Sequence, residues 1–355
     1  MNLRIGIVGL PNAGKSTLFN ALLKKQAALA ANYPFATIDP NIGIVQVPDE
    51  RLKVLAEIVK TNKIVPATVE FVDIAGLVRG AHSGEGLGNK FLSHIRETSA
   101  ICYVLRFFKD PEVIHVSDRV DPKEDLAILN EELILADLQT LENQKEPKKN
   151  AGKEDQLRWQ LVNTLKRHLN NNQPAREIKL DEEELELIKS LNLLTLKPAI
   201  YVANLDEDQL SQSREVLADF SLKPVIALSA KIESELIDVK ETERREFLQS
   251  VGIDEPVLNK LAKISYDTLG LMSFLTAGTL EARAWTIPKN TPAVTAAGVI
   301  HTDFSQKFIK AEIVTFADFV NSGGWTNSRL QGKVRQEGRD YLMQEGDVVE
   351  FKIGA

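Results

Sequence analysis

A phosphate-binding pattern, G-x-x-x-x-G-K-[ST], is formed near the amino terminus by Gly9, Gly14, Lys15 and Ser16. In such a loop the glycines let backbone N–H groups surround phosphate oxygens, the lysine amine reaches the outer phosphates, and the serine hydroxyl ligates Mg²⁺. An apolar run at 3–10 predicts the preceding strand, and leucine spacing predicts a helix over 15–25. The residues expected to hold the phosphates are Asn12, Ala13, Gly14, Lys15, Ser16 and Thr17.

Two further segments have the character of nucleotide-sensing switches. Asp73 ends the apolar segment 67–73 and Gly76 follows three residues later, so the carboxylate can hold Mg²⁺ through water while the glycine N–H touches the terminal phosphate. Thr37 lies in the loop between the two motifs, where a threonine could close on Mg²⁺. Taken alone, Thr37 could also be a plain loop residue.

Leu77 occupies the position after Gly76, where a water-positioning glutamine is expected, and it has no polar side-chain atom. Another group must therefore orient the attacking water. His115 is our first candidate and His82, in a glycine-rich stretch, is the reserve; either could instead be a structural histidine. Asn12 offers a third route, because it either helps to hold K⁺ or only shapes the loop.

Base recognition is predicted at two places that follow apolar strands. The first is Asn204, Leu205 and Glu207, and the second is Ser229, Ala230 and Lys231. GTP-binding proteins carry N-K-x-D at the first place, where the aspartate accepts the paired donors of guanine. Leu205 and Glu207 depart from that pattern, so the site lacks the interaction that most favours guanine and, with it, the main discrimination against adenine.

Composition restricts the classes of protein to which the chain could belong. It has 355 residues, 43% of them hydrophobic, which is enough for two or three domains. The apolar runs are too short to span a bilayer and no signal-peptide pattern precedes the first strand, so we expect a cytoplasmic protein without a membrane partner. A single cysteine, Cys102, forbids an internal disulfide framework, and no Cys/His cluster has zinc-ligand spacing. The net charge of −7 limits any RNA contact to a local patch.

The order of elements predicts an α/β fold with a mostly parallel sheet, built on strands near 3–10, 67–73, 100–108, 198–204 and 224–230. We divide the chain into a phosphate-loop nucleotide-binding domain (1–118 and 196–276), an inserted helical hairpin (119–195) and a small α+β domain (277–355). The stretch before residue 276 is expected to be helical, and strands are predicted at 282–288, 308–314 and 347–353.

Taken together, "GLPNAGKST", "PFATIDPN", "DIAGLVRGAHSGEGLGNKFL", "NLDE", "ARAWTIP" and "IHTDF" resemble the Obg-like ATPases of the YchF subfamily over essentially the whole chain. The resemblance implies an ATPase that can also use GTP, a C-terminal TGS domain of β-grasp type, and association with ribosomes in translation or stress responses. Many members carry a cysteine where this chain has Ala36, so redox control through that position is not expected. Cys102, inside an apolar strand, is interpreted as a core residue.

The hairpin tip is the locally basic part of the chain. Residues 144–168 hold seven Lys/Arg and three acidic residues, a net charge of +4, whereas the region from Leu280 onward has nine of each sign. The tip could lie on ribosomal RNA phosphates or be only a solvated helix face. Partners are therefore expected to be the ribosome, as its large subunit or whole, and ribosomal RNA, through the tip and the TGS domain, with no DNA specificity. Two alternative functions stay open, a GTP-specific translational GTPase and a nucleotide-binding scaffold with negligible turnover.

Overall fold

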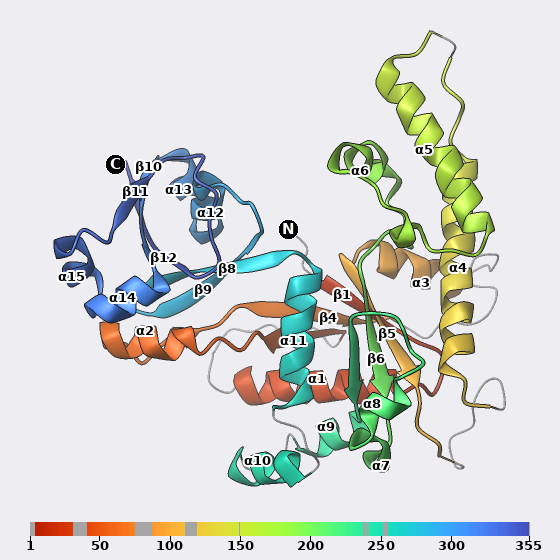
Figure 1. The fold of residues 1–355 in the computed structure, drawn as a ribbon, viewed down its shortest axis with the longest axis horizontal. Coiled ribbons are helices and arrows are strands. Elements are labelled where there is room, and N and C mark those ends of the chain that lie inside the picture. Colours follow the sequence, from red (N-terminus) through yellow and green to blue (C-terminus); the bar gives the residue numbers. More distant parts are fainter. Residues whose placement is uncertain are drawn as a thin grey trace. The chain divides into compact units, whose positions relative to one another are not determined.

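The structure is a computed structural model that describes residues 4–30, 41–74, 87–110, 119–148, 150–236, 239, 241–250 and 255–354 (Figure 1). The chain folds into two compact units. The first consists of Met1–Ile44 and Glu70–Lys260, and the second of Val45–Val69 and Leu261–Ala355.

A six-stranded sheet forms the centre of the first unit. Its order is β2-β4-β1-β5-β6-β7, with the bounds Ile42–Gln46, Thr68–Asp73, Arg4–Val8, Ala100–Arg106, Ala199–Asn204 and Val225–Leu228. Strand β1 is parallel to β4 and β5, β5 to β6, and β6 to β7. Five neighbouring strands therefore end at the same edge, where open α/β sheets bind their ligands. The predicted α/β fold with a mostly parallel sheet is confirmed.

Helices cover both faces of this sheet. On one face, α3 (Leu87–Arg96) and the first half of α4 (Pro122–Glu142) bury a shared core with β1, β5 and β6. On the other, α1 (Lys15–Ala30) packs against β1 and α9 (Ala230–Leu236) (Figure 1). The remaining helices are α7 (Glu207–Leu210), α8 (Ser213–Val216) and α10 (Glu241–Ser250), and α11 (Val257–Thr268) begins in this unit and continues into the second. In the described part of the chain no helix is both long and apolar enough to cross a membrane.

The predicted hairpin consists of α4 and α5 (Lys153–Asn170), and the structure adds α6 (Glu182–Ile188) with two short 3-10 turns, Ala175–Glu177 and Lys189–Leu191. The side chain of Asp121 caps α4 by accepting from the backbone N–H groups of Lys123 and Glu124. The outer half of α4, α5 and α6 share a second core of leucine and isoleucine side chains. Asp137 is fully buried and ties α4 to the returning chain, because its carboxylate accepts from Leu194 N (2.7 Å), Thr195 N (2.8 Å) and Thr195 Oγ1 (2.7 Å).

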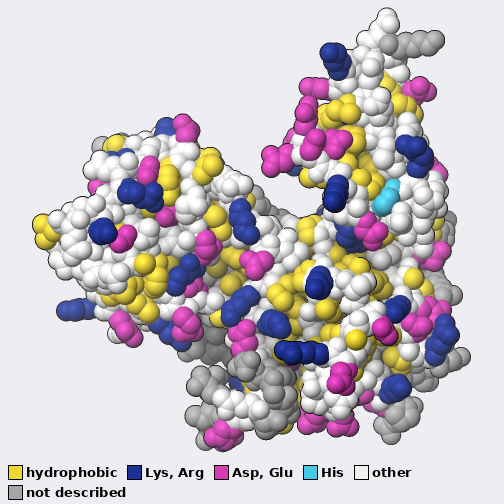
Figure 2. Space-filling model, viewed as in Figure 1, with side chains coloured by type: hydrophobic (Ala, Val, Ile, Leu, Met, Phe, Trp, Pro, Cys, Tyr) yellow, Lys and Arg dark blue, Asp and Glu magenta, His cyan; other side chains and the backbone are white. Residues whose placement is uncertain are grey.

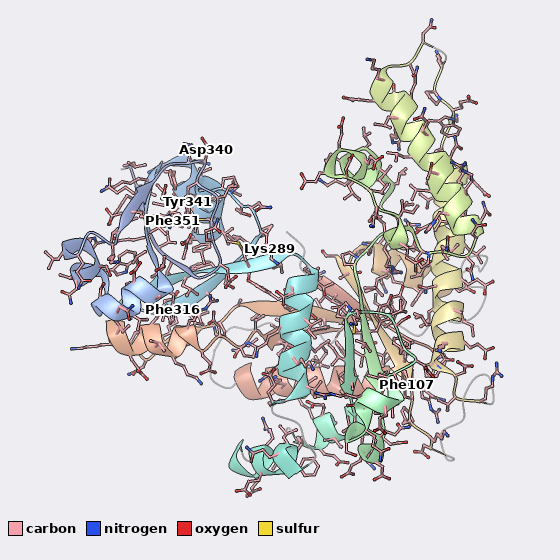
Figure 3. All side chains as sticks on the ribbon, viewed as in Figure 1. Phe107, Lys289, Phe316, Asp340, Tyr341 and Phe351 are labelled. Atoms are coloured by element: carbon pink, nitrogen blue, oxygen red, sulfur yellow. The ribbon has the colours of Figure 1, made fainter. Side chains whose placement is uncertain are left out.

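The second unit is built on a six-stranded mixed sheet in the order β11-β10-β12-β8-β9-β3. The strands are Arg335–Glu337, Phe308–Thr315, Asp347–Ile353, Leu271–Ala277, Ala282–Pro288 and Ile64–Val65, and the helices are α2 (Arg51–Val59), α12 (Ala293–Ile300), α13 (Thr302–Gln306), α14 (Phe316–Ser322) and α15 (Trp325–Leu330). Phe351, labelled in Figure 3, packs against its core. The ring of Phe351 lies 5.8 Å from that of Phe274 and 5.9 Å from that of Phe308. Helix α12 contributes three buried alanines to the same core.

Two features of the second unit differ from the sequence prediction. The segment Val45–Val69, placed by sequence with the nucleotide-binding domain, belongs to this unit, because β3 pairs with β9 and α2 packs on β8 and β9. The expectation of helix up to residue 276 is wrong, since α11 ends at Thr268 and Leu271–Ala277 is strand β8. A short, continuously buried strand has no alternation to separate it from a helix.

Candidate functional site

The phosphate loop joins β1 to α1, and its backbone requires glycine at two positions. A Cβ at Gly9 would lie 2.5 Å from the carbonyl oxygen of Val104, and one at Gly14 would lie 2.1 Å from Asn204 Nδ2. Gly14 also has a φ of +92°, a left-handed conformation that favours glycine. Asn12 has a φ of 63°, which asparagine tolerates better than most residues. This supports the loop-shaping role of Asn12 and leaves the potassium role untested.

Two opposite charges, the buried Lys15 and the half-buried Asp73, interact beside this loop. Lys15 is 8% exposed, and its amine donates to the carbonyl oxygen of Leu10 at 3.3 Å. Burial lowers the pKa of Lys15, and the charge of Asp73 opposes that shift. Burial likewise raises the pKa of Asp73, against the charge of Lys15. A bound polyanion near Lys15 would offset the cost of burying its charge.

The surroundings of Asp73 fit a magnesium ion. Its Oδ1 atom is buried and has no hydrogen-bond partner among the residues that the structure describes. Ser16 and Thr17 open helix α1 with exposed side chains, so a hydroxyl and a carboxylate, both ligands that Mg²⁺ prefers, are available near the phosphate loop. Buried polar atoms without partners are rare in folded proteins, and an ion or water at Asp73 would account for this one.

Asn204 connects the base motif to the phosphate loop. Its side chain is 4% exposed; Nδ2 donates to the carbonyl oxygen of Ala13 at 3.0 Å, and Oδ1 accepts from the backbone N–H of Ala230 at 2.9 Å. The structure thus brings together the phosphate loop and both predicted base segments. Beside them lies a cavity of about 840 Å³ whose lining includes Gly14, Thr17, Asn204, Leu205, Glu207, Ser229, Ala230 and Lys231.

Leu205 and Glu207, the two residues of the N-x-x-E pattern that differ from the guanine pattern, have different environments. Leu205 is 1% exposed and packs in a core with Ala203, Leu210 and Ile232, although it also lines the cavity. Glu207 is exposed at the first position of α7. A lysine at 205 would therefore have to place its charge in a core, whereas Glu207 can be changed without that cost.

Sequence reasoning missed the segment 107–110 that follows β5. Phe108, Lys109 and Asp110 line the same cavity. No motif marks these residues. Their place directly after a central parallel strand could have identified them, because that edge of the sheet carries the ligand site.

Several predicted residues lie outside the described residues, namely Ala36, Thr37, Gly76, Leu77, His82 and His115. Their roles stay predictions. Cys102 is described: it is a free, fully buried thiol on β5, and burial raises its pKa to about 12. The interpretation of Cys102 as a core residue is confirmed.

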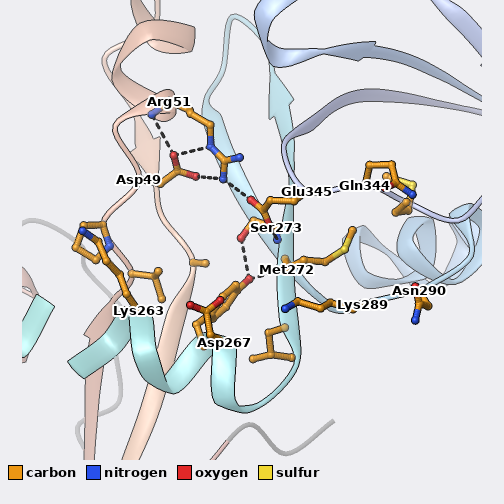
Figure 4. A pocket seen from close by; sticks show the side chains of 16 residues that line it. Asp49, Arg51, Lys263, Asp267, Met272, Ser273, Lys289, Asn290, Gln344 and Glu345 are labelled. Carbon is orange, nitrogen blue, oxygen red and sulfur yellow. Dashed lines mark hydrogen bonds and ion pairs between the residues drawn. The ribbon is translucent and has the colours of Figure 1, made fainter. Parts of the chain in front are cut away.

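The second unit contains a separate cavity of about 580 Å³ (Figure 4). Its most prominent charged group, Arg51, is already bonded to Asp49 at 2.7 Å and to Glu345 at 2.5 Å, and Glu345 also accepts from the backbone N–H of Ser273 at 2.8 Å. These bonds join the 45–69 segment to the C-terminal sheet of the same unit. We interpret this arginine network as structural.

Comparisons with known proteins agree with this geometry. Residues 4–144 match a family model described as "50S ribosome-binding GTPase", and residues 271–354 match the model YchF-GTPase_C, described as a protein of unknown function. The Ribosome-binding ATPase YchF of Bacillus subtilis (strain 168) is 47% identical over 366 residues, which cover 99% of this chain and 100% of that protein. The protein of the same name from Haemophilus influenzae is 47% identical over 363 residues, 99% of each chain. The structure of the Schizosaccharomyces pombe YchF GTPase superposes with a TM-score of 0.87 at 37% identity, over 99% of this chain and 98% of that one.

Proposed function

This chain belongs to the YchF family, and from that premise we propose that it is a ribosome-associated nucleotide hydrolase. The proposed reaction converts ATP to ADP and phosphate. The protein would act as a molecular switch in translation or stress responses. The observation that carries the proposal is the Asn204 side chain, which holds the phosphate loop and the base segments around one cavity. The ribosome as partner and ATP as substrate are taken from the names of the relatives, which are ribosome-binding ATPases. We also propose a cytoplasmic location, where ribosomes and ATP are found.

Each part of the site has a role in this reaction. The backbone N–H groups of the phosphate loop hold the phosphate oxygens, and the Lys15 amine neutralises the outer phosphates. Ser16 would hold Mg²⁺ directly, Asp73 through a water molecule, and Thr37 would join them from the first switch. When bound, Mg²⁺ withdraws charge from the phosphate oxygens.

The water-positioning group is the open part of the mechanism, because Leu77 has no polar atom to offer. We propose His115 for this role, since it follows β5 in the sequence and a histidine can act as an acid or base near neutral pH, with His82 as the reserve and K⁺ held through Asn12 as the third route. Gly76 would sense the terminal phosphate through its backbone N–H. Single-turnover hydrolysis by His115→Ala, His82→Ala and Asn12→Ala, each in potassium and in sodium, separates the three. A normal rate in His115→Ala would eliminate it.

For the base, we propose that ATP binds at least as well as GTP. The reason is that Glu207 replaces the aspartate that accepts hydrogen bonds from guanine, and Leu205 offers no cation beside the base. Competition of ATP and GTP for one labelled nucleotide tests this directly. Guanine selectivity would favour the alternative of a GTP-specific GTPase.

For the partner, we propose that the basic hairpin tip contacts ribosomal RNA, with the TGS-like C-terminal region as a second contact. At the tip a cavity of about 450 Å³ is lined by Lys145, Lys148, Asn150 and Trp159, among others. An aromatic ring beside lysines is a combination that can hold a nucleotide by stacking and charge. By contrast, acidic side chains gather over α6 on the face shown in Figure 2, so the contact would be confined to the hairpin tip.

The experiment that tests the function is multiple-turnover phosphate release from ATP with Mg²⁺, with and without ribosomes. Lys15→Ala should abolish turnover, and Ser16→Ala should weaken the magnesium dependence. Lys53→Ala, an exposed lysine of α2, is the matched control and should leave the rate unchanged. Turnover that persists in Lys15→Ala would show that the site is wrongly placed, and no turnover in the wild-type protein would favour the scaffold alternative.

Ribosome binding is tested separately by sedimentation. The double substitution Lys145→Glu and Lys148→Glu should reduce co-sedimentation with ribosomes without changing intrinsic ATP turnover, because it reverses two charges at the tip. The matched control is Lys53→Glu with Lys60→Glu, two exposed lysines of the 45–69 segment that lie outside both proposed contacts. Equal losses in both pairs would argue against the tip.

A further inference from the structure

The segment 107–110 is fastened to the base motif by its backbone. The N–H groups of Phe107 and Phe108 both donate to the carbonyl oxygen of Asn204, at 2.9 and 3.1 Å. Asn204 is the residue whose side chain holds the phosphate loop. The segment is thus fixed relative to the cavity through the same residue that organises the rest of the site.

The side chain of Arg106, the last residue of β5, donates hydrogen bonds to the backbone of this segment. It is 2% exposed, Nε donates to the carbonyl oxygen of Phe108 at 3.3 Å, and Nη2 donates to that of Asp110 at 3.3 Å. Its guanidinium carbon also lies 4.4 Å from the centre of the Phe108 ring. A planar fork that both donates to two carbonyls and stacks on a ring is specific to arginine, so lysine could not replace it.

Two side chains at the start of helix α7 also contact the segment. The carboxylate of Asp206 accepts from the backbone N–H of Lys109 at 2.9 Å. Gln209 donates through Nε2 to the carbonyl oxygen of Phe107 at 3.3 Å, and its Oε1 accepts from Asp206 N at 2.9 Å. The third residue of the "NLDE" motif thus contacts the 107–110 segment.

We propose that Arg106, Asp206 and Gln209 are positioning residues that hold 107–110 as a preformed wall of the base pocket, and that this wall strengthens the preference for ATP that Leu205 and Glu207 create. The inference rests on the proposed function. A wall that is ordered before binding spares the nucleotide the entropic cost of ordering it, and a pocket of fixed shape discriminates between bases better than a loose one. The phosphate contacts are made by other residues and should not depend on the wall.

The test measures dissociation constants of the full-length protein, with Mg²⁺, for ATP, GTP and inorganic tripolyphosphate. Tripolyphosphate has no base and therefore reports on the phosphate loop alone. Asp206→Ala and Gln209→Ala should weaken ATP binding by about tenfold each, corresponding to about 1.4 kcal/mol. They should also narrow the ATP:GTP ratio and leave tripolyphosphate binding unchanged. Asp206→Asn keeps an oxygen that can accept from Lys109 N and should restore most of the affinity for ATP.

Two further variants sharpen the test. Glu215→Ala removes an acidic side chain from the neighbouring helix α8, is exposed, and controls for the change of charge. Arg106→Lys should show the same selective loss for ATP; because Arg106 is buried, that variant could fail to fold, and the Asp206 and Gln209 variants then decide the outcome.

The outcomes separate this inference from the function on which it rests. If the wild-type protein does not bind ATP, the proposed function fails. If it does bind ATP but Asp206→Ala and Gln209→Ala bind it equally well, the wall is overturned and the function stands. A parallel loss of tripolyphosphate binding would also overturn the inference, because it would mean that these side chains support the whole site.

Discussion

Replacing Gly14 with alanine should separate the phosphate loop from the base motif. The added Cβ would lie 2.1 Å from Asn204 Nδ2, closer than any real contact. Asn204 is short, buried and bonded at both ends, to the carbonyl oxygen of Ala13 at 3.0 Å and to the N–H of Ala230 at 2.9 Å. It cannot turn away from the methyl group without losing at least one of these bonds.

The expected size follows from two contributions. Alanine at a φ of +92° carries a backbone strain of about 1–2 kcal/mol. Leaving the buried groups of Ala13 and Ala230 without partners costs about 1–3 kcal/mol each, so the displaced asparagine adds about 2–6 kcal/mol. The sum is about 3–8 kcal/mol, which for a unit of this size corresponds to a fall in melting temperature of roughly 6–30 °C.

Gly332→Ala is the matched control. Gly332 has a φ of +68°, and nothing lies within 4 Å of the Cβ position, so alanine there adds strain without a clash. Thermal unfolding followed by circular dichroism should show a larger fall for Gly14→Ala than for Gly332→Ala, and calorimetry should show at least a tenfold loss of ATP affinity only in Gly14→Ala. Equal melting temperatures and equal ATP affinities in the two variants would refute the structural role assigned to Asn204.

Four other predictions concern residues that the structure describes. Glu207→Asp alone should move the ATP:GTP binding ratio towards GTP by about tenfold, as measured by competition binding. Leu205→Lys should instead lower the unfolding free energy by about 2–5 kcal/mol, as measured by thermal unfolding, because it places a charge in a core. A stable, GTP-selective Leu205→Lys protein would contradict the assignment of Leu205 to the core. Since burial raises the pKa of Cys102 to about 12, its thiol stays protonated at pH 8, so Ellman's reagent should modify it only after unfolding; rapid reaction with the native protein would show that β5 opens. Asp137→Asn should cost about 2–4 kcal/mol, because an amide cannot accept all three of its hydrogen bonds, and an unchanged denaturation midpoint would argue against that contact.

Much of the first unit could be predicted from sequence because its signals are local. The phosphate loop, the apolar strands and the leucine-spaced helices each lie within a short window, and strands β1, β4, β5, β6 and β7 were all expected. Parallel strands place their carboxyl ends at one edge, so the meeting of Gly14, Asn204 and Ala230 was also foreseeable.

The missed parts depend on pairs of segments that are far apart in the chain. Strand β3 has two residues and no periodicity of its own; it exists because Ile64 and Val65 pair with Ala282 and Arg283 on β9. The assignment of Val45–Val69 to the second unit follows from that pairing and from the packing of α2. No pattern within residues 45–69 carries this information.

The sequence by itself determined which residue types are available for chemistry, because the phosphate-binding pattern, the Asp73 and Gly76 pair and the altered base motif are specified by residue types at fixed spacing. Only the tertiary structure decided that Leu205 is a core residue and that Arg106, Asp206 and Gln209 bind the 107–110 segment. The physical reason is that a hydrogen bond or a buried contact between distant residues depends on where the sheet brings their strands together.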